Sequence, residues 1–589
     1  MTASATTSPE PRIWLEGDTV CFMFPPIAGI RALAASLGAA HHPASGRYEL
    51  QLRPSKGSAI ARLAQAAGWL SLPAEVERRL EEFADHIRQN IEGSNALEAG
   101  EPIEIPGLAR PLHPFQQAGV RYMLRNPRTL VGDQQGLGKT VETIAALLKQ
   151  DAFPALIVCP ASVKHVWAGE WGAFAPNVSV QVVEGRAPVK FTADVVIANY
   201  DVLAAHVRAF RQYGLRAAAA DEAHLLKHKE TRRAQAVKAL TTTLDVIYLL
   251  SGTPVPNKPV ELTNLLDILG YLDAFGGYWA FVRRYCDPRR NQYGWDLSGA
   301  ANLRELHDKL RAICMLRRTT RDVLTELPAV QRAALPVDID NRVEYRQAET
   351  QLLRYIYEKA MQDQAFQARI AELPEHEQKR CRSEYASDKA RKAARAEVLV
   401  RIETLKQLAA AGKMRAVAEW IDNYLAGTDD KLLIFATHVA VQHALYARYP
   451  DSVTVFAEHS SEERVSAVTR FQTDPTARLA IMSLQAGGVG LTMTAARHVL
   501  FVGYGWRSID HDQAESRAYG RLNDPHPITS YWAVGRDTID EQIVALLESK
   551  RAVTEMITDG VMQDNSGSVL TDLMRQYEAR ARETYGSSN

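Results

Sequence analysis

Short apolar runs alternate with helical patterns from about residue 110 to residue 255 of this chain. Apolar runs flanked by glycine or polar residues are typical of buried strands, and helical segments between them favour parallel pairing. The expected strands lie at residues 130–131, 155–159, 194–198, 217–220 and 246–250. The pattern therefore predicts a doubly wound parallel α/β unit.

A second series of apolar runs begins after residue 430. Its expected strands lie at residues 431–435, 453–456, 479–482, 498–502 and 530–534, and a glycine-rich turn follows the third of them at 486–492. The spacing again predicts an α/β unit with a parallel sheet. Two α/β units of similar size are therefore expected, with a cleft between them.

The other segments complete a division of the chain into five expected parts. The parts are an accessory α+β module (1–100), a first α/β lobe (101–335), a charged helical protrusion or linker (336–415), a second α/β lobe (416–550) and a polar helical tail (551–589). Within the module, an extended run is expected at 13–24, a helix at 30–37, a strand at 48–52 and a helix ending near Trp69. The tail is expected to end in a disordered Gly-Ser-Ser-Asn.

Composition narrows the class of protein. The chain has 589 residues, which exceeds what one hydrophobic core supports, and 46% apolar with 23% charged residues is typical of a globular protein. No run has the length of a membrane span and the first residues do not resemble a signal peptide, so a cytoplasmic protein without membrane contact is expected. The five cysteines show no metal-binding spacing and are interpreted as reduced thiols.

The formal net charge is zero, which argues against a protein that coats nucleic acid along its whole surface. A local basic groove remains compatible with that value, because binding requires charge only where the phosphates lie. The densest basic stretch, residues 379–401, also contains alanines and glutamates and is interpreted as a solvated helical face.

The first expected strand is followed by Asp133-Gln-Gln-Gly-Leu-Gly-Lys-Thr140 and then by a helical pattern. Gly136 and Gly138 allow backbone N–H groups to approach phosphate oxygens at the positive end of that helix. Lys139 can reach the β- and γ-phosphates, and the Thr140 hydroxyl can bind Mg²⁺. The segment predicts a binding loop for ATP, although an aspartate replaces the first glycine of the usual pattern.

The sequence Asp221-Glu-Ala-His224 follows another expected strand, at the carboxyl end where parallel sheets bind ligands. One carboxylate, that of Asp221, can hold Mg²⁺, while Glu222 positions the water that attacks the γ-phosphate. Together with the loop at 133–140, this pair predicts an enzyme that hydrolyses ATP with Mg²⁺ as cofactor.

The order of these and further motifs over about residues 110–550 resembles that of the Swi/Snf-type ATPases of helicase superfamily two. The segments that carry the resemblance are 112–117, 133–140, 159–167, 198–200, 250–254, 315–328, 483–492 and 513–521. Residues 285–302 are similar to a segment of the annealing-helicase (HARP-like) branch. The resemblance implies that the two α/β units are RecA-like lobes, and that the accessory module and the helical segment are additions to them.

Individual roles also follow from this resemblance. Gln116 occupies the position that binds the adenine base, and Gly490 lies in a segment that approaches the nucleotide. The implied DNA-backbone contacts are Ser162, Lys164, Tyr200 and Thr492. Arg517 and Arg521 lie in a segment similar to the arginine-finger helix; their spacing places them on one helical face, from which we expect both to approach the γ-phosphate. Two departures are Gln134, where the family usually has glutamate, and Gly520, at the second arginine position.

The expected function is that of a DNA-dependent ATPase that translocates on double-stranded or branched DNA without sequence preference, with annealing or fork remodelling as a further expectation. Two alternatives remain at this point. The first is a strand-separating helicase of the Asp-Glu-Ala-His type, acting on RNA or DNA. The second is a binding module in which ATP switches the affinity for DNA or for a protein partner, which would be compatible with the departures at Gln134 and Gly520.

Overall fold

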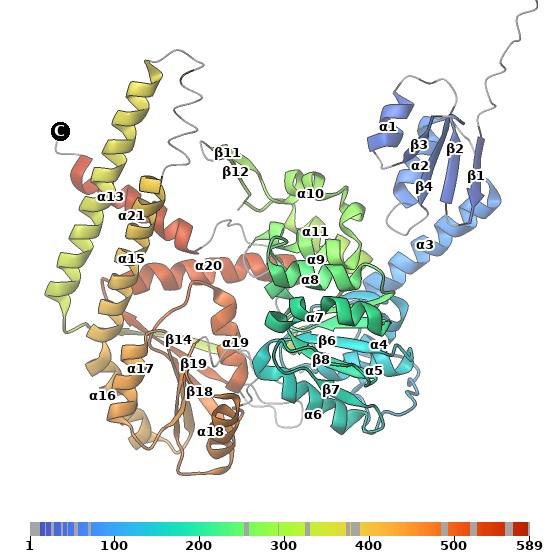
Figure 1. Cartoon of the computed structure of the whole chain (residues 1–589). Helices are drawn as coiled ribbons and strands as arrows, with labels where there is room; N and C mark the ends of the chain where they lie inside the picture. The colour runs from blue at the N-terminus through green and yellow to red at the C-terminus, as the bar shows by residue number, and fades with distance from the viewer. Residues whose placement is uncertain are drawn as a thin grey trace, which may run out of the picture.

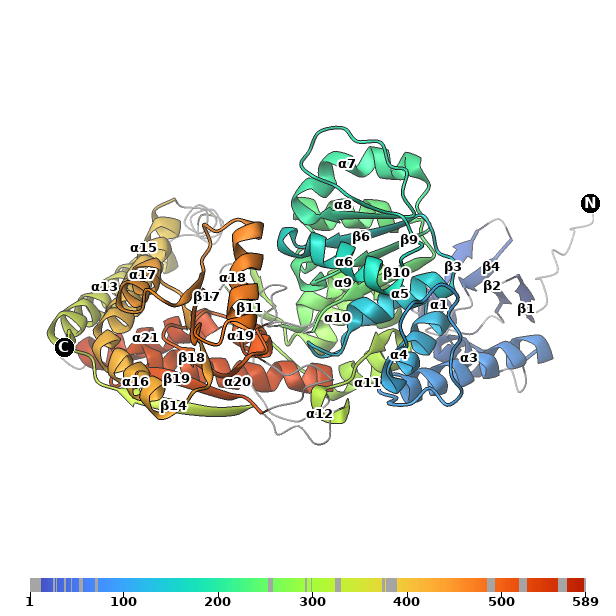
Figure 2. The same ribbon diagram turned by 90° about the horizontal axis from the view of Figure 1, so that it is seen from below.

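The structure is a computed structural model. It describes residues 12–586 except 18, 25–26, 28, 37–38, 44, 52–56, 69–71, 253–257, 292–293, 298, 324–329, 373–376, 378–388, 485–492, 519–526 and 560–568. Two α/β lobes lie side by side, with a small module attached to the first lobe by a helix (Figures 1 and 2). No helix in the described part of the chain is long and apolar enough to cross a bilayer.

The first lobe contains a seven-stranded parallel sheet in the order β13-β5-β10-β9-β6-β8-β7. Its strands are β5 (Arg128–Val131), β6 (Ala155–Cys159), β7 (Val180–Val182), β8 (Val195–Asn199), β9 (Ala217–Ala220), β10 (Val246–Leu250) and β13 (Met315–Leu316). All five strands expected from the sequence are present, and each is buried along most of its length. The short strands β7 and β13 were not expected, because two or three residues give no periodic signal.

Helices cover both faces of this sheet, as the predicted doubly wound fold requires. They are α4 (Pro114–Arg125), α5 (Lys139–Lys149), α6 (Lys164–Phe174), α7 (Tyr200–Tyr213), α8 (Arg232–Thr241), α9 (Leu262–Leu269), α10 (Tyr278–Tyr285), α11 (Leu303–Ile313) and α12 (Thr320–Val323). The 3-10 turns η2 (Ala161–Val163), η3 (Ala223–Leu226), η4 (Pro259–Glu261) and η5 (Leu272–Phe275) connect them, and a hairpin of β11 (Arg289–Asn291) and β12 (Gly294–Asp296) follows α10.

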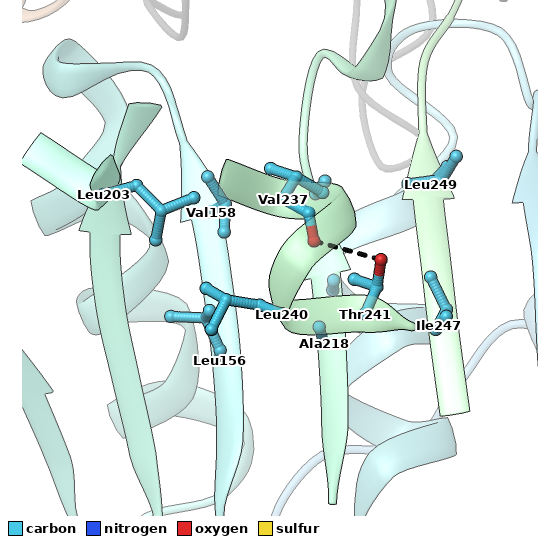
Figure 3. Close-up of a pocket in the computed structure, with 11 residues that line it drawn as sticks. Leu156, Val158, Leu203, Ala218, Val237, Leu240, Thr241, Ile247 and Leu249 are labelled. Atoms are coloured by element: carbon cyan, nitrogen blue, oxygen red, sulfur yellow. Dashed lines mark hydrogen bonds between the residues drawn. The ribbon is translucent and has the colours of Figure 1, made fainter. Parts of the chain in front are cut away.

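Strand β9 consists of four alanines, and its small side chains leave a narrow apolar void beneath α8 (Figure 3). Leu156, Val158, Leu203 and Leu240 line it together with the alanines. The single hydroxyl at its wall, that of Thr241, donates a hydrogen bond to the Val237 carbonyl at 3.0 Å. The void is therefore a packing defect without polar groups that would hold a ligand.

The second lobe contains a six-stranded parallel sheet in the order β14-β19-β18-β15-β17-β16. Its strands are β14 (Gln331–Val337), β15 (Lys431–Ala436), β16 (Val453–Val455), β17 (Leu479–Ser483), β18 (Ala496–Phe501) and β19 (Thr529–Gly535). Its helices are α13 (Arg342–Ala371), α15 (Lys389–Gly412), α16 (Met414–Gly427), α17 (Val439–Arg448), α18 (Ser461–Thr473), α19 (Ser508–Ala518), α20 (Ile539–Asp559) and α21 (Val569–Gly586). The two parallel sheets confirm the predicted fold class.

Two expected boundaries of this lobe are corrected. Strand β14 pairs in parallel with β19 along its whole length, so the second sheet begins at Gln331 rather than beyond 415. Helix α21 is not a polar tail, because Val569, Leu573, Tyr577 and Ala581 are buried in the core of the lobe. Their spacing of four residues places them on one helical face, which the many charged residues between them conceal in the sequence.

The N-terminal module is an antiparallel sheet in the order β1-β2-β4-β3 covered by two helices. Its elements are β1 (Arg12–Glu16), β2 (Thr19–Met23), α1 (Ile30–Ser36), β3 (Ala40–His42), β4 (Arg47–Gln51) and α2 (Gly57–Ala66). The expected extended run at 13–24 is in fact a hairpin that turns at Gly17, where φ is +58°.

A long helix, α3 (Ala74–Gly93), joins the module to the first lobe. The buried Asn90 amide donates to Asn126 Oδ1 at 3.1 Å, and Arg311 donates to the Ile91 carbonyl at 2.6 Å. The C-terminal part of this helix is therefore fixed to the first lobe, although the sequence placed it in the accessory module.

Candidate active site

The loop between β5 and α5 is shaped by its glycines. Gly136 and Gly138 both have φ of +86°, and Gly138 directly precedes the first residue of α5. The positive φ favours glycine at 138, and a side chain there would also force the amide of Gln116 to move. The backbone of the loop therefore lies at the N-terminus of α5. A glycine-rich loop in this position binds anions.

Lys139 is the first residue of α5 and bends back over the loop. Its ammonium group donates to the carbonyl of Asp133 at 2.8 Å and to the carbonyl of Gln134 at 3.2 Å. Burial lowers the pKa of Lys139, while the nearby carboxylates of Glu222, Asp133 and Asp221 oppose that shift. The pKa of Lys139 is lowered overall, and the three carboxylates limit that loss of basicity.

Asp133, which replaces the first glycine of the usual loop pattern, has a structural role. Its carboxylate and that of Glu142 both pair with the guanidinium of Arg318, and all three side chains are fully buried. The backbone N–H of Arg318 also donates to Asp133 Oδ1 at 2.8 Å. These bonds tie the loop to the chain that leaves the first lobe, and removal of the arginine would leave two buried carboxylates without a counter-ion.

Asp221 lies directly after β9 and is held by two donors. Trp167 Nε1 donates to Asp221 Oδ2 at 2.9 Å, and the backbone N–H of Glu222 donates to Asp221 Oδ1 at 2.9 Å. Burial, reinforced by the charge of Glu222, raises the pKa of Asp221 to about 6. The carboxylate is therefore ionised only above mildly acidic pH.

Glu222 has a left-handed backbone conformation, with φ of +50°. This turn directs its carboxylate to His224, whose Nδ1 lies 3.2 Å from Glu222 Oε2. Burial raises the pKa of Glu222, but His224, Lys139 and Arg517 outweigh that effect and the pKa lies below its usual value. Glu222 therefore ionises at a lower pH than its neighbour Asp221, and the two carboxyl groups can perform different tasks.

The second lobe supplies Arg517 from α19 to the same cluster of charges. Burial lowers the pKa of Arg517 to about 10, while the carboxylates of Glu222 and Asp221 across the lobe junction oppose the shift. The adjacent Ser516 hydroxyl donates a hydrogen bond to the side chain of Gln135 on the loop of the first lobe. A cation of one lobe and two carboxylates of the other are therefore brought together.

Thr140 and Asp221 were expected to hold Mg²⁺. Thr140 lies in the first turn of α5, and Asp221 offers a half-buried carboxylate at the end of β9. Hydroxyl and carboxylate oxygens are the ligands that Mg²⁺ uses alongside water and phosphate oxygens. The described residues contain no group of three or more His, Cys, Asp or Glu side chains that could hold a metal ion, and binding of Mg²⁺ by Thr140 and Asp221 stays a prediction.

Gln116 was expected to contact the adenine base. In the structure its Oε1 accepts a hydrogen bond from the His113 backbone at 3.0 Å, and its Nε2 donates to the Leu137 carbonyl at 3.2 Å. These bonds cap α4 and link it to the loop that precedes α5. Gln116 therefore lies against the loop, and its role toward a base stays a prediction.

The structure corrects two expected DNA contacts. Lys164 is buried, where its ammonium group donates to the Val183 carbonyl at 3.0 Å and pairs with Glu184 at 2.5 Å. Tyr200 is also buried, and its hydroxyl donates to the backbone carbonyl of Asp221 at 2.6 Å. Both side chains thus stabilise the first lobe from within. Ser162, in η2, is half-buried, and its contact with DNA stays a prediction.

Three further expected site residues, Gly490, Thr492 and Arg521, lie outside the described residues. The same holds for the side chains of the basic stretch at 379–395.

The sequence did not indicate two residues that complete the site. Trp167 and Arg318 contact Asp221 and Asp133 from positions 54 and 185 residues away along the chain. Trp167 was noted only within a motif of the resemblance. A buried arginine produces no periodic pattern in the sequence. The role of Arg318 could have been suspected only from the pair Arg317-Arg318 that follows a short apolar run.

Family models match both lobes of the chain. Residues 115–386 match the SNF2-related domain, and residues 412–522 match the helicase conserved C-terminal domain. The chain is 29% identical to the human protein named DNA annealing helicase and endonuclease ZRANB3 over 76% of this chain and 40% of that protein. It is 29% identical to the Drosophila melanogaster protein named SWI/SNF-related matrix-associated actin-dependent regulator of chromatin subfamily A-like protein 1, over 78% of this chain and 57% of that protein.

The chain therefore spans about two-fifths to three-fifths of the length of these two relatives. Among solved structures, the Sulfolobus solfataricus SWI2/SNF2 ATPase core in complex with dsDNA aligns with a TM-score of 0.36 and 23% identity, covering 78% of this chain and 96% of that one. With an SNF2-related domain that carries the phosphate loop and a helicase C-terminal domain that carries Arg517, the chain belongs to the Swi/Snf-type family of helicase superfamily two.

Proposed function

We propose that this protein hydrolyses ATP when bound to DNA and uses the energy to translocate on double-stranded or branched DNA. The observation that carries the proposal is the hydrogen bond from Ser516 of the second lobe to Gln135 on the nucleotide loop of the first. Next to Ser516 is Arg517, whose pKa is lowered by burial and held up by the nearby carboxylates of Glu222 and Asp221. A site divided between two lobes responds to their relative position, which is what couples hydrolysis to movement. The names of the relatives, which include DNA annealing helicases, support DNA as the partner.

In the proposed reaction, the triphosphate lies against the loop before α5, where backbone N–H groups and the helix N-terminus accept its charge. Lys139 exchanges its bonds to the carbonyls of Asp133 and Gln134 for bonds to phosphate oxygens. Mg²⁺, when bound with the nucleotide to Thr140 and Asp221, neutralises charge on the phosphate oxygens. These residues bind and orient the nucleotide before any bond is broken.

Glu222 is the residue suited to orient the attacking water, because its carboxylate is ionised and fixed by the turn at the end of β9. Arg517 stabilises the charge that develops on the transferred phosphoryl group, as arginine fingers do. The bond between Ser516 and Gln135 keeps α19 against the loop while this occurs. Release of the products removes the charge that draws the lobes together, and each cycle of closing and opening advances the DNA.

The test is the steady-state ATPase rate of the whole chain without nucleic acid and with single-stranded DNA, duplex DNA, forked DNA or RNA. We expect duplex and forked DNA to stimulate the wild-type rate most. Lys139→Ala and Glu222→Gln remove positioned charges and are expected to lower the stimulated rate by on the order of a hundredfold or more.

Lys149→Ala is the matched control, since Lys149 is an exposed lysine at the other end of the same helix. Wild-type turnover by Lys139→Ala or Glu222→Gln would contradict the assigned roles. Stimulation by single strands or RNA alone would indicate a strand-separating helicase, and tight ATP binding without turnover on any nucleic acid would indicate a switch.

A further inference from the structure

Two tryptophans form an exposed aromatic pair on the first lobe, remote in sequence from the nucleotide loop. Trp279 of α10 is 50% exposed and Trp295 of β12 is 55% exposed. Their ring centroids lie 6.4 Å apart with the ring planes at 62°. Exposed side chains of this size are uncommon unless they serve an interaction, because each leaves a large apolar surface in water.

The packing of α10 does not require Trp279. The helix contributes Phe281, Val282 and Tyr285 to the core of the lobe, and all three are buried. Trp279 lies on the opposite side, where it contacts the ring of Tyr278 and that of Trp295. Core packing therefore accounts for Phe281, Val282 and Tyr285 but not for the exposed Trp279.

The hairpin that carries Trp295 adds positive charge to the same surface. Arg290 of β11 is the direct cross-strand partner of Trp295, so the two side chains lie on one face of the hairpin. Arg290 is exposed. Arg289, one residue earlier, lies on the other face and pairs with Asp287 at 2.8 Å. We call Trp279, Trp295 and Arg290 the stacking platform.

The stacking platform lies beside the junction of the two lobes. The hairpin extends from the first lobe toward the helices of the second (Figure 1), and Asp296 Oδ2 lies 3.6 Å from a guanidinium nitrogen of Arg575 on α21. A nucleic acid that is moved by the two lobes would therefore pass near these rings.

We propose that the stacking platform binds unpaired bases at a branch in DNA, with Trp279 and Trp295 stacking on bases and Arg290 beside a phosphate. The inference rests on the proposed function and deepens it by naming the structural class of DNA that the protein prefers. Aromatic rings bind bases of any sequence through their faces, and an adjacent arginine supplies charge complementarity to the backbone. Bases within a duplex are already stacked on their neighbours, so the rings discriminate in favour of a branch.

The test compares the affinity of the full chain for a fork with single-stranded arms and for a blunt duplex of the same length, by fluorescence anisotropy. Trp279→Ala and Trp295→Ala are each expected to lower the ratio of the two affinities about tenfold, within the range of base–aromatic stacking. Trp279→Phe and Trp295→Phe retain a ring and are expected to restore most of the preference. Arg290→Gln is expected to lower fork affinity more than Arg289→Gln, the matched change on the opposite face.

A second arm replaces the bases next to the branch point by abasic sites, which keeps the phosphates. The wild type is expected to lose its preference on this fork, and the alanine variants to show no further loss. An unchanged preference in the alanine variants, or on the abasic fork, would overturn the inference. Variants that change the sedimentation of the protein but not its affinity for the fork would also overturn the inference. They would identify the surface as one that binds protein.

The ATPase rate of the wild type on blunt duplex separates this inference from the proposed function. Without stimulation by any DNA, the proposed function fails. If duplex DNA stimulates the ATPase but the tryptophan variants keep the fork preference of the wild type, only the inference about the stacking platform is wrong.

Discussion

Asp221 depends on a hydrogen bond from a residue in a different element. Burial and the charge of Glu222 disfavour its ionised form, whereas the indole N–H of Trp167 favours it. The pKa of about 6 reflects the balance of these effects, and activity that requires the carboxylate is expected to be lost as the pH falls through this value. We therefore expect Asp221 to set the acid limit of the proposed ATPase activity.

Trp167→Phe tests this balance. Loss of the indole donor removes an interaction that lowers the pKa, so the acid limb of the pH–rate profile is expected to move to higher pH. The measurement is the DNA-stimulated ATPase rate from about pH 5 to 8, a range chosen to bracket the carboxyl titration. Because Mg²⁺ favours the ionised carboxylate, a higher Mg²⁺ concentration should move the limb back toward lower pH.

Trp171→Phe is the matched control. Trp171 is buried in the same helix, and its indole nitrogen has no hydrogen-bond partner among the described residues. Both substitutions remove the same volume, but only that at 167 removes a donor to Asp221. Equal shifts of the two profiles would show that packing, not the hydrogen bond, controls the titration.

Other single residues show what local sequence patterns leave open. Lys164 and Tyr200 resemble nucleic-acid contacts by position in a motif, yet both are buried and bonded within the first lobe. Asp133 occupies a loop position that glycine usually fills, because its carboxylate is required by Arg318. The identity of a residue indicates the bonds that it can make, and only the fold selects among them.

At the scale of elements, α19 is held in place by β14. Arg332 of β14 donates to both carboxylate oxygens of Glu515, at 3.0 and 3.1 Å from Nε, and to Asp512 at 3.3 Å. Burial raises the pKa of Glu515, but Arg332 outweighs it and the pKa lies below its usual value. The strand that begins the second lobe thereby fixes the orientation of the helix that carries Arg517.

Arg332→Gln is expected to lower kcat about tenfold with little change in the KM for ATP, because α19 is loosened while the nucleotide loop is untouched. Arg332→Lys, which keeps the charge, is expected to recover part of the rate. Arg342→Gln is the control, since Arg342 forms a more exposed ion pair with Asp537 at 3.1 Å. A raised KM with unchanged kcat would refute a positioning role for Arg332.

The C-terminal helix α21 is part of the second lobe because of how it packs. Helix α21 buries Leu573 and Tyr577 in the second lobe, and Tyr577 donates to Glu349 of α13 at 3.3 Å. The sequence predicts a helix here but not its contacts, because its apolar residues are separated by charged ones.

At the scale of the whole molecule, the lobes are joined by more than the connecting chain. Helix α20 extends from the second lobe and packs against α11 of the first (Figure 1), in addition to the bond between Ser516 and Gln135. Among the described residues, α3 fixes the accessory module to the first lobe. Movement of the second lobe is therefore expected to leave the module in place relative to the nucleotide loop.

A zero net charge makes the attraction of DNA local rather than global. Contacts to phosphates release counter-ions, so the DNA concentration that gives half-maximal stimulation is expected to rise steeply with salt between about 50 and 200 mM. The ATPase rate without DNA is expected to change much less over the same range. A stimulation constant that does not depend on salt would contradict a backbone-binding mode, and a dependence on DNA sequence would contradict nonspecific recognition.

The sequence by itself determined the two α/β lobes, because the burial of a parallel strand requires a continuous apolar run that can be read within a few residues. It also determined the loop at 133–140 and the pair Asp221–Glu222, since phosphate binding requires glycines and a lysine at short spacing. Cys21, Cys159, Cys286 and Cys314 are free and buried in the structure. Location in the cytoplasm stays a prediction.

Only the tertiary structure decided which distant residues complete these local motifs. The bond between Arg318 and Asp133 spans 185 residues, and that between Ser516 and Gln135 spans 381. Trp279 and Trp295 form a pair only because a hairpin folds back beside α10. Such contacts depend on how whole elements pack, and no pattern of neighbouring residues specifies them.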